Sequence, residues 1–158
     1  MNNQLTAEAI EKQEQGLILT RFNNDDAWEL GQIAHDLAKQ RGASVTINIE
    51  KNGQLVFATA FEGTNPDNER WMAGKRNVVK LFHRSSLAMK LKLVQKQKSA
   101  GEAFFVDDRK YLFSGGAIPI RIAQVGIIGS VAVSGLAEEE DHALPADAIT
   151  ELKSRLGI

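Results

Sequence analysis

Apolar residues recur at helical spacing in the first forty positions of the chain. The stretch 6–15 predicts a short acidic helix that Thr6 caps and Gly16 ends. A second helix is predicted over 26–40, with an apolar stripe that includes Trp28.

Alternation of apolar and polar residues predicts a sheet. Val45, Ile47 and Ile49 alternate with polar residues, and Asn52-Gly53 follows them as the sequence of a two-residue hairpin turn. Further short strands are predicted over 17–19, 103–107, 111–113, 117–121 and 125–133.

An acidic loop over 138–142 is predicted to lead to a last helix over 145–156. Hairpins favour antiparallel pairing over alternating strand–helix units. The fold class is therefore α/β (α+β): a profilin-like or PAS-like sandwich of about five antiparallel strands with helices on both faces. Residues 1–158 form one domain, an ordinary size for a single core.

The longest pattern predicts a basic helix from Pro66 to Lys98. Trp71, Val78, Val79, Phe82, Met89 and Leu93 fall on one face, and so do the polar side chains of Lys75, Ser85 and Ser86. An unbroken helix of this length would measure about 50 Å. We therefore expect a break near Ser85-Ser86 or after Leu93.

Charge is distributed unevenly along the chain. The segment 70–98 holds nine of the nineteen Lys and Arg residues and no Asp or Glu, while all twenty acidic residues lie elsewhere. This asymmetry predicts an anionic ligand or an acidic protein surface as the partner. We expect the acidic surface to belong to another subunit of a homodimer or larger ring. Nucleic acid is not expected, because no recognised motif accompanies the basic residues.

Composition excludes several kinds of site. The chain has no cysteine, which excludes disulfides, thiolate metal sites and cysteine nucleophiles. His35, His83 and His142 are the only histidines and have no zinc-ligand spacing, so no metal site is predicted. No apolar stretch is long enough to cross a membrane, and we expect a cytoplasmic protein.

Lys75 is the most informative polar residue, because an ammonium on an apolar face needs a partner. Asp107, Asp108 or Asp141 could supply it, and so could a bound anion, which we favour. Catalysis by Lys75 is the alternative reading.

Serines and glycines offer further candidates. Ser85-Ser86 lacks the turn of a nucleophile elbow. The favoured interpretation is that these small residues let a neighbouring element approach closely or bond back to the helix carbonyls. Gly115-Gly116 and Ser134-Gly135 lie at strand ends, where backbone N–H groups can form an anion-binding concavity.

Three sequence blocks carry a resemblance to a known family. They are RWMAGKRNVVKLFHRSSLAMKLKL at 70–93, YLFSGGAIPIR at 111–121 and VGIIGSVAVSGLAEEEDHAL at 125–144. In this order they resemble the haem-degrading-domain superfamily, which includes the GlcG-like proteins, and more narrowly its small stand-alone branch of unassigned function. The VSGL element with Asp141-His142 is the most specific part. Ser114 departs from the pattern, since relatives in this branch often carry histidine there.

The resemblance implies a profilin-like sandwich, symmetric homo-oligomers assembled from dimers, and haem or a related tetrapyrrole as ligand in some relatives. We expect a homo-oligomeric protein that binds an anionic small molecule between the basic helix and the glycine turns. An enzyme acting on a small organic acid or cofactor fragment, with Lys75 or His142 as acid or base, is one alternative, and an oligomeric scaffold for protein partners is another. The candidate ligand-binding residues are Lys75, Arg76, His83, Arg84, Ser85, Ser86, Gly115, Gly116, Ser134, Gly135, Asp141 and His142.

Overall fold

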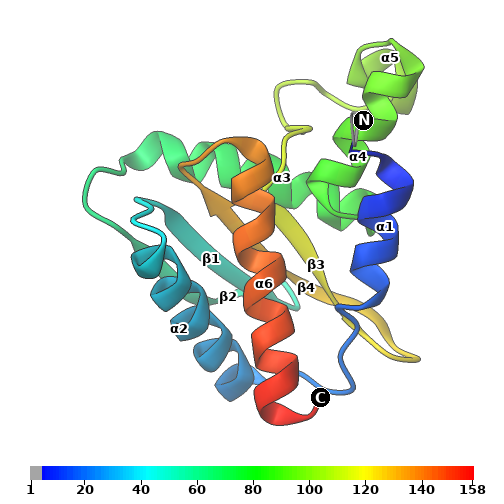
Figure 1. Ribbon diagram of the computed structural model, residues 1–158. Helices are drawn as coiled ribbons and strands as arrows, with labels where there is room; N and C mark the ends of the chain where they lie inside the picture. Colours follow the sequence, from blue (N-terminus) through cyan, green and yellow to red (C-terminus); the bar gives the residue numbers. More distant parts are fainter. Residues whose placement is uncertain (1–4) are drawn as a thin grey trace.

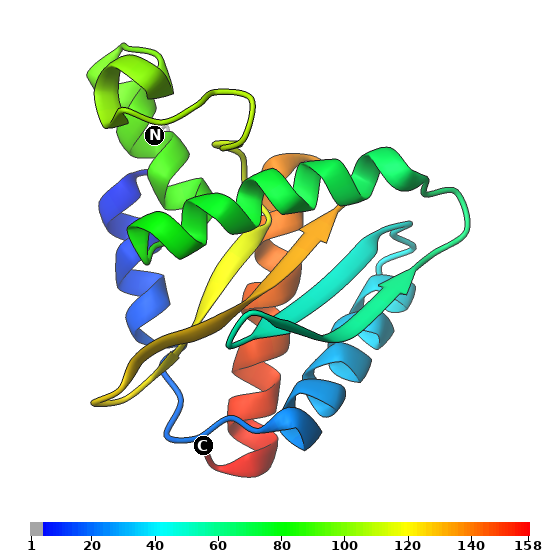
Figure 2. The same ribbon diagram turned by 180° about the vertical axis from the view of Figure 1, so that it is seen from behind.

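The computed structural model describes residues 5–158, which form a four-stranded antiparallel sheet with helices on both faces (Figures 1 and 2). The strands are β1 (Thr46–Lys51), β2 (Gln54–Ala60), β3 (Ala117–Ile122) and β4 (Gly126–Ser134), in the order β2-β1-β4-β3. The helices are α1 (Ala7–Gln15), α2 (Asn24–Gln40), α3 (Pro66–Phe82), α4 (Ser86–Lys96), α5 (Ala100–Phe104) and α6 (Glu138–Leu156).

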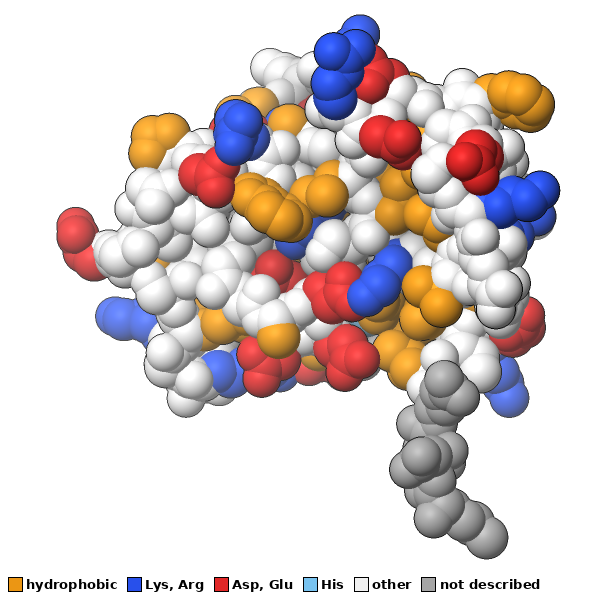
Figure 3. Space-filling view, turned by 90° about the horizontal axis from the view of Figure 1, so that it is seen from above, with side chains coloured by type: hydrophobic (Ala, Val, Ile, Leu, Met, Phe, Trp, Pro, Cys, Tyr) orange, Lys and Arg blue, Asp and Glu red, His pale blue; other side chains and the backbone are white. Residues whose placement is uncertain are grey.

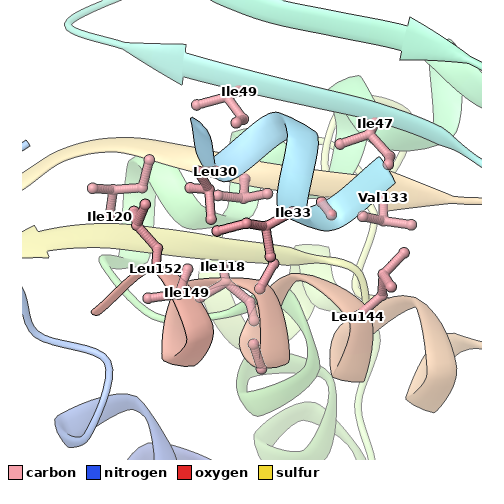
Figure 4. Close-up of a cluster of buried hydrophobic side chains, with 14 of the residues drawn as sticks. Leu30, Ile33, Ile47, Ile49, Ile118, Ile120, Val133, Leu144, Ile149 and Leu152 are labelled. Atoms are coloured by element: carbon pink, nitrogen blue, oxygen red, sulfur yellow. The ribbon is translucent and has the colours of Figure 1, made fainter. Parts of the chain in front are cut away.

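The main core lies between one face of the sheet and the helices α2 and α6 (Figure 4). Alternate strand residues point into it, because successive side chains of a strand lie on opposite faces. Those labelled in Figure 4 are Ile47, Ile49, Ile118, Ile120 and Val133, and they meet Leu30, Ile33, Leu144, Ile149 and Leu152 from the two helices.

On the opposite face α3 crosses one end of the sheet, as Figure 2 shows. Asn65 caps this helix, with Pro66 at its first position. Met72 and Val79 pack on Ala117 and Ala132 of the sheet. This crossing carries α3 directly over the ends of β3 and β4 that adjoin the glycine turns.

The predicted hairpin at Asn52-Gly53 is confirmed. Both residues have positive φ, 50° and 81°, as a two-residue primed turn requires. The expected break of the long helix is also confirmed, because α3 ends at His83, with φ of 55°, and Ser85 caps α4. The break turns α4 away from the sheet and toward α1.

Three of the predicted strands are wrong. The stretch 103–107 begins inside α5, and 111–113 pairs with no strand. Phe82, Phe104 and Phe113 form an aromatic cluster with ring centroids 5.1–5.9 Å apart, so these half-buried residues pack on one another without a sheet. The stretch 17–19 contributes only a single parallel bridge, from Leu19 to Ile122.

The acidic stretch 138–142 is helical and not a loop. It forms the first turn of α6, where four carboxylates lie at the positive end of the helix dipole. Pro145 therefore lies inside the helix, and reading it as the first helical residue was wrong.

The two tryptophans do not lie on buried faces as predicted. Trp28 is exposed and packs edge-on against Phe57, and Trp71 is 44% exposed. Met72 instead takes the buried position on α3, one residue further along the helix.

Candidate functional site

Lys75 and Asp141 form a buried ion pair between α3 and the first turn of α6. The Nζ atom of Lys75 lies 3.1 Å from Oδ2 of Asp141, and it donates a second hydrogen bond to the carbonyl oxygen of Val133 at 3.2 Å. Each residue is 2% exposed. The prediction that a bound anion is the partner of Lys75 is therefore wrong, and Asp141, the alternative considered, is the partner.

The two glycine turns enclose this pair. A Cβ atom at Gly116, where φ is +138°, would lie 2.7 Å from Nζ of Lys75 and 2.4 Å from the carbonyl oxygen of Val133. At Gly135, where φ is +140°, it would lie 2.5 Å from the carbonyl oxygen of Ser44. A Cβ atom at Gly115 would likewise clash with the backbone carbonyl group of Glu138. The glycines thus give space to the lysine and allow close backbone approach.

Burial governs the protonation of the pair. It lowers the pKa of Lys75 and raises the pKa of Asp141, because each charge is held away from water, and the charge of each partner acts in the opposite direction. The backbone N–H of Leu136 donates to Oδ1 of Asp141 at 2.9 Å, so the carboxylate is fixed in orientation.

A cavity of about 220 Å³ adjoins the pair. Lys75, Ser134 and Asp141 are almost fully buried and form its inner wall, while residues at the start of α3 form its outer part. Its lining comprises Asp67, Asn68, Trp71, Lys75, Ser114, Ser134, Gly135, Leu136 and Asp141. Ser114 donates to Glu138 at 3.0 Å, so its hydroxyl proton is already engaged.

A wider groove of about 400 Å³ lies on the other side of Trp71, between α3 and the loop 108–112. Trp71 and Tyr111 supply aromatic surface to it, and Arg70, Arg109 and Lys110 supply positive charge. None of these five residues was predicted from the sequence to line a ligand site. An Arg-Trp pair and an Arg-Lys-Tyr run were visible in the sequence, but nothing in their spacing brings them together.

Most cations of the basic segment are paired within this chain. Arg70, Lys75, Arg76, Lys80, Arg84, Lys90 and Lys92 each meet a carboxylate of the same chain. In Figure 3, accordingly, the Lys and Arg side chains lie among Asp and Glu and do not gather in one basic patch. Because most of these cations are already neutralised, charge gives no reason to expect an acidic surface from another subunit.

Several predicted site residues have structural roles. Arg76 binds Glu50 at 3.3 Å, and Arg84 binds Glu11 at 3.4 Å. Ser85 caps α4. Ser86 accepts a hydrogen bond from the backbone N–H of Ala117, as expected if small hydroxyl residues let a neighbouring element approach closely. None of these four lines the cavity or the wider groove.

The two candidate histidines lie apart from the Lys75 pair. His83 lines a separate groove with Val79 and Ile127. His142 follows Asp141 but its Nε2 lies 2.8 Å from Oε1 of Gln13 on α1, and Nδ1 has no partner among residues 5–158. Burial lowers the pKa of His142 to about 4, so this imidazole is neutral at pH 7.

Two further findings concern the described residues only. Within residues 5–158 no group of three or more His, Asp or Glu side chains is placed to hold a metal ion. Nor does any helix in this range have the length and apolar character needed to cross a membrane.

The sheet order, the covering helices and the glycine-enclosed site define a mixed α/β sandwich with a buried lysine–aspartate pair. The chain belongs to the family described as "Haem degrading protein HbpS-like", whose model matches residues 22–150. The family indicated by the three sequence blocks is thereby confirmed.

Individual relatives agree with this assignment. The chain is 40% identical over 144 residues to a UPF0303 protein of Streptomyces coelicolor, covering 91% of each chain. It resembles the crystal structure of the Ybr137w protein with a TM-score of 0.91 at 28% identity, over 99% of this chain and 92% of that one. It shares its fold with PduOC, solved as a heme complex, with a TM-score of 0.67 at 15% identity, over 83% and 94% of the chains.

Proposed function

We propose that this protein binds a flat, anionic tetrapyrrole of the haem class in the groove between α3 and the loop 108–112. In this proposal it acts in the cytoplasm as a self-associating binding protein. The observation that carries the proposal is the lining of the groove, which combines aromatic walls with cations.

Each part of such a ligand has a counterpart in the groove. Trp71 and Tyr111 offer flat apolar surface to a macrocycle. Arg70 and Arg109 can meet carboxylates such as propionates, because their present partners, Asp67 and Asp107, are exposed carboxylates that contribute little. Lys110 has no ion-pair partner within residues 5–158 and remains available.

The family supports the ligand class. Its description names haem degradation, and a protein of the same fold has been solved with heme, although at 15% identity that likeness concerns the fold. Tyr111 is the residue of the groove whose side chain is a known type of haem-iron ligand. It would hold the iron, and the arginines would hold the propionates.

Haemin titration tests the proposal. We expect a saturable Soret band with the wild-type protein and about tenfold weaker binding for Arg109→Ser/Lys110→Ser, since two exposed charge contacts contribute roughly 0.5–1 kcal/mol each. The matched control is Lys96→Ser/Lys98→Ser, which removes the same charge from the exposed end of α4. No saturable band, or equal weakening in both double variants, would reject the groove.

A further inference from the structure

The cavity beside Lys75 and Asp141 has features of a second binding site, which adjoins the wider groove at Trp71. Its inner wall carries two hydrogen-bond donors that the protein leaves unused. A ligand that fits them can be named by its chemistry.

The first donor is the third N–H of Lys75. An ammonium has three donors, and those of Lys75 that are engaged go to Asp141 and Val133. No third acceptor for Nζ is found among residues 5–158. A buried donor without a partner costs free energy, so an acceptor in the cavity would stabilise this arrangement.

The second donor is the hydroxyl of Ser134, at the end of β4. Its oxygen accepts a long hydrogen bond of 3.4 Å from the amide of Asn68. Within the described part of the chain its proton is donated to no residue. Ser134 and Lys75 line the same small cavity, so both donors can reach one oxygen-bearing group.

Charge and size restrict the ligand further. Asp141 already neutralises Lys75, and Asp67 adds a second carboxylate at the outer part of the lining. A dianion such as phosphate would therefore meet no excess positive charge. A volume of about 220 Å³ equals the share of roughly seven water molecules in the liquid, which suits a compact molecule.

We propose that this cavity binds a small uncharged carbonyl compound, whose oxygen accepts hydrogen bonds from Lys75 and Ser134. Asp141 acts as a positioning residue, because its bonds to Lys75 and Leu136 hold the ammonium in place. Burial lowers the pKa of Lys75, and an acceptor oxygen in contact with Nζ would offset part of that effect.

Nuclear magnetic resonance tests the site without knowledge of the natural ligand. The probe is propanamide, with inorganic phosphate as the anion that should not bind. We expect saturable shifts of the indole N–H of Trp71 and the backbone N–H of Leu136, both in the cavity lining. The indole of Trp28, which lies against Phe57, is the internal reference.

Two matched serine variants identify the donor. Ser134→Ala should weaken probe binding about tenfold, the effect of losing one hydrogen bond to a ligand. Ser130→Ala removes a hydroxyl from a buried position four residues earlier on β4, outside the cavity, and should leave affinity unchanged.

The proposal is overturned if propanamide does not shift these signals, if phosphate shifts them equally, or if the two serine variants bind alike. A shift of Trp71 without a shift of Leu136 would also overturn it, because Trp71 lines both spaces whereas Leu136 does not line the wider groove.

Discussion

Lys75 and Asp141 depend on each other because neither charge has access to water. Replacing Lys75 with Met leaves the carboxylate of Asp141 buried without its cation, which costs about 3–5 kcal/mol. We expect this loss in the free energy of unfolding measured by urea denaturation. If a bound anion were the partner of Lys75, as favoured from the sequence, the same replacement would leave no buried carboxylate unpaired and would not lower the stability of the fold.

The double variant Lys75→Met/Asp141→Leu serves as the control for that change. It removes both charges, and we expect it to recover much of the lost stability, because apolar replacements of a buried pair are often neutral or stabilising. A Lys75→Met protein as stable as the wild type would show that the pair does not stabilise the fold.

His142 should make stability depend on pH. The unfolded histidine binds a proton below about pH 6.5, while burial lowers the folded pKa to about 4, so acidification between these values favours unfolding. Between pH 7 and pH 4 we expect the free energy of unfolding of His142→Gln to fall by about 3 kcal/mol less than that of the wild type. Denaturation with urea across this pH range measures the difference.

The comparison between variant and wild type matters because other groups titrate in the same range. Burial raises the pKa of Glu14 and of Asp141, and such groups oppose the effect of His142, since their folded forms bind protons more readily. Identical profiles for His142→Gln and the wild type would contradict the prediction.

At the scale of elements, the sequence correctly predicted helix ends and the hairpin turn, which depend on interactions between neighbouring residues. Thr6 and Gly16 mark the ends of α1, and Asn52-Gly53 forms the hairpin turn, because caps and turns depend on neighbouring residues. The break after Phe82 followed from helix length. Apolar runs at 103–107 and 111–113 were misread as strands, since Phe104 and Phe113 shield each other from water in an aromatic cluster instead of in a sheet.

The candidate site was predictable in part for the same reason. Lys75 stood out as a cation on an apolar face, and its need for a carboxylate could be stated from the sequence. That Asp141 supplies it could not be decided, because the two residues are brought together by the crossing of α3 over the sheet. The groove formed by Trp71 and Tyr111 depends on the path of a loop without regular structure, which no periodicity encodes.

For the whole molecule, the lobe formed by α4 and α5 projects away from the sheet (Figure 1). Phe105, the C-cap residue of α5, is 95% exposed, and Val94 on α4 is largely exposed as well. Exposed apolar side chains that form one continuous patch are typical of interaction surfaces. Since the cations of the basic segment are mostly paired internally, this apolar surface is now the main reason to expect self-association.

We predict a dimer or larger assembly by light scattering at micromolar concentration, and a shift toward the monomer for Phe105→Ser. Val125→Ser is the control, because Val125 is also exposed but lies on the turn between β3 and β4. A wild-type monomer, or equal effects of both variants, would exclude the lobe as the contact.

Trp71 lines both the groove proposed for a tetrapyrrole and the cavity proposed for a small carbonyl compound. Its indole N–H is held by Asp67 at 3.1 Å, so one ring orientation sets the width of both spaces. A ligand that turns this ring acts on the other site as well. Thermodynamics makes such an effect reciprocal: the factor by which the tetrapyrrole changes affinity for the small molecule equals the factor in the reverse direction. Through this one side chain, a ligand bound in the cavity would change the affinity of the groove for its own ligand.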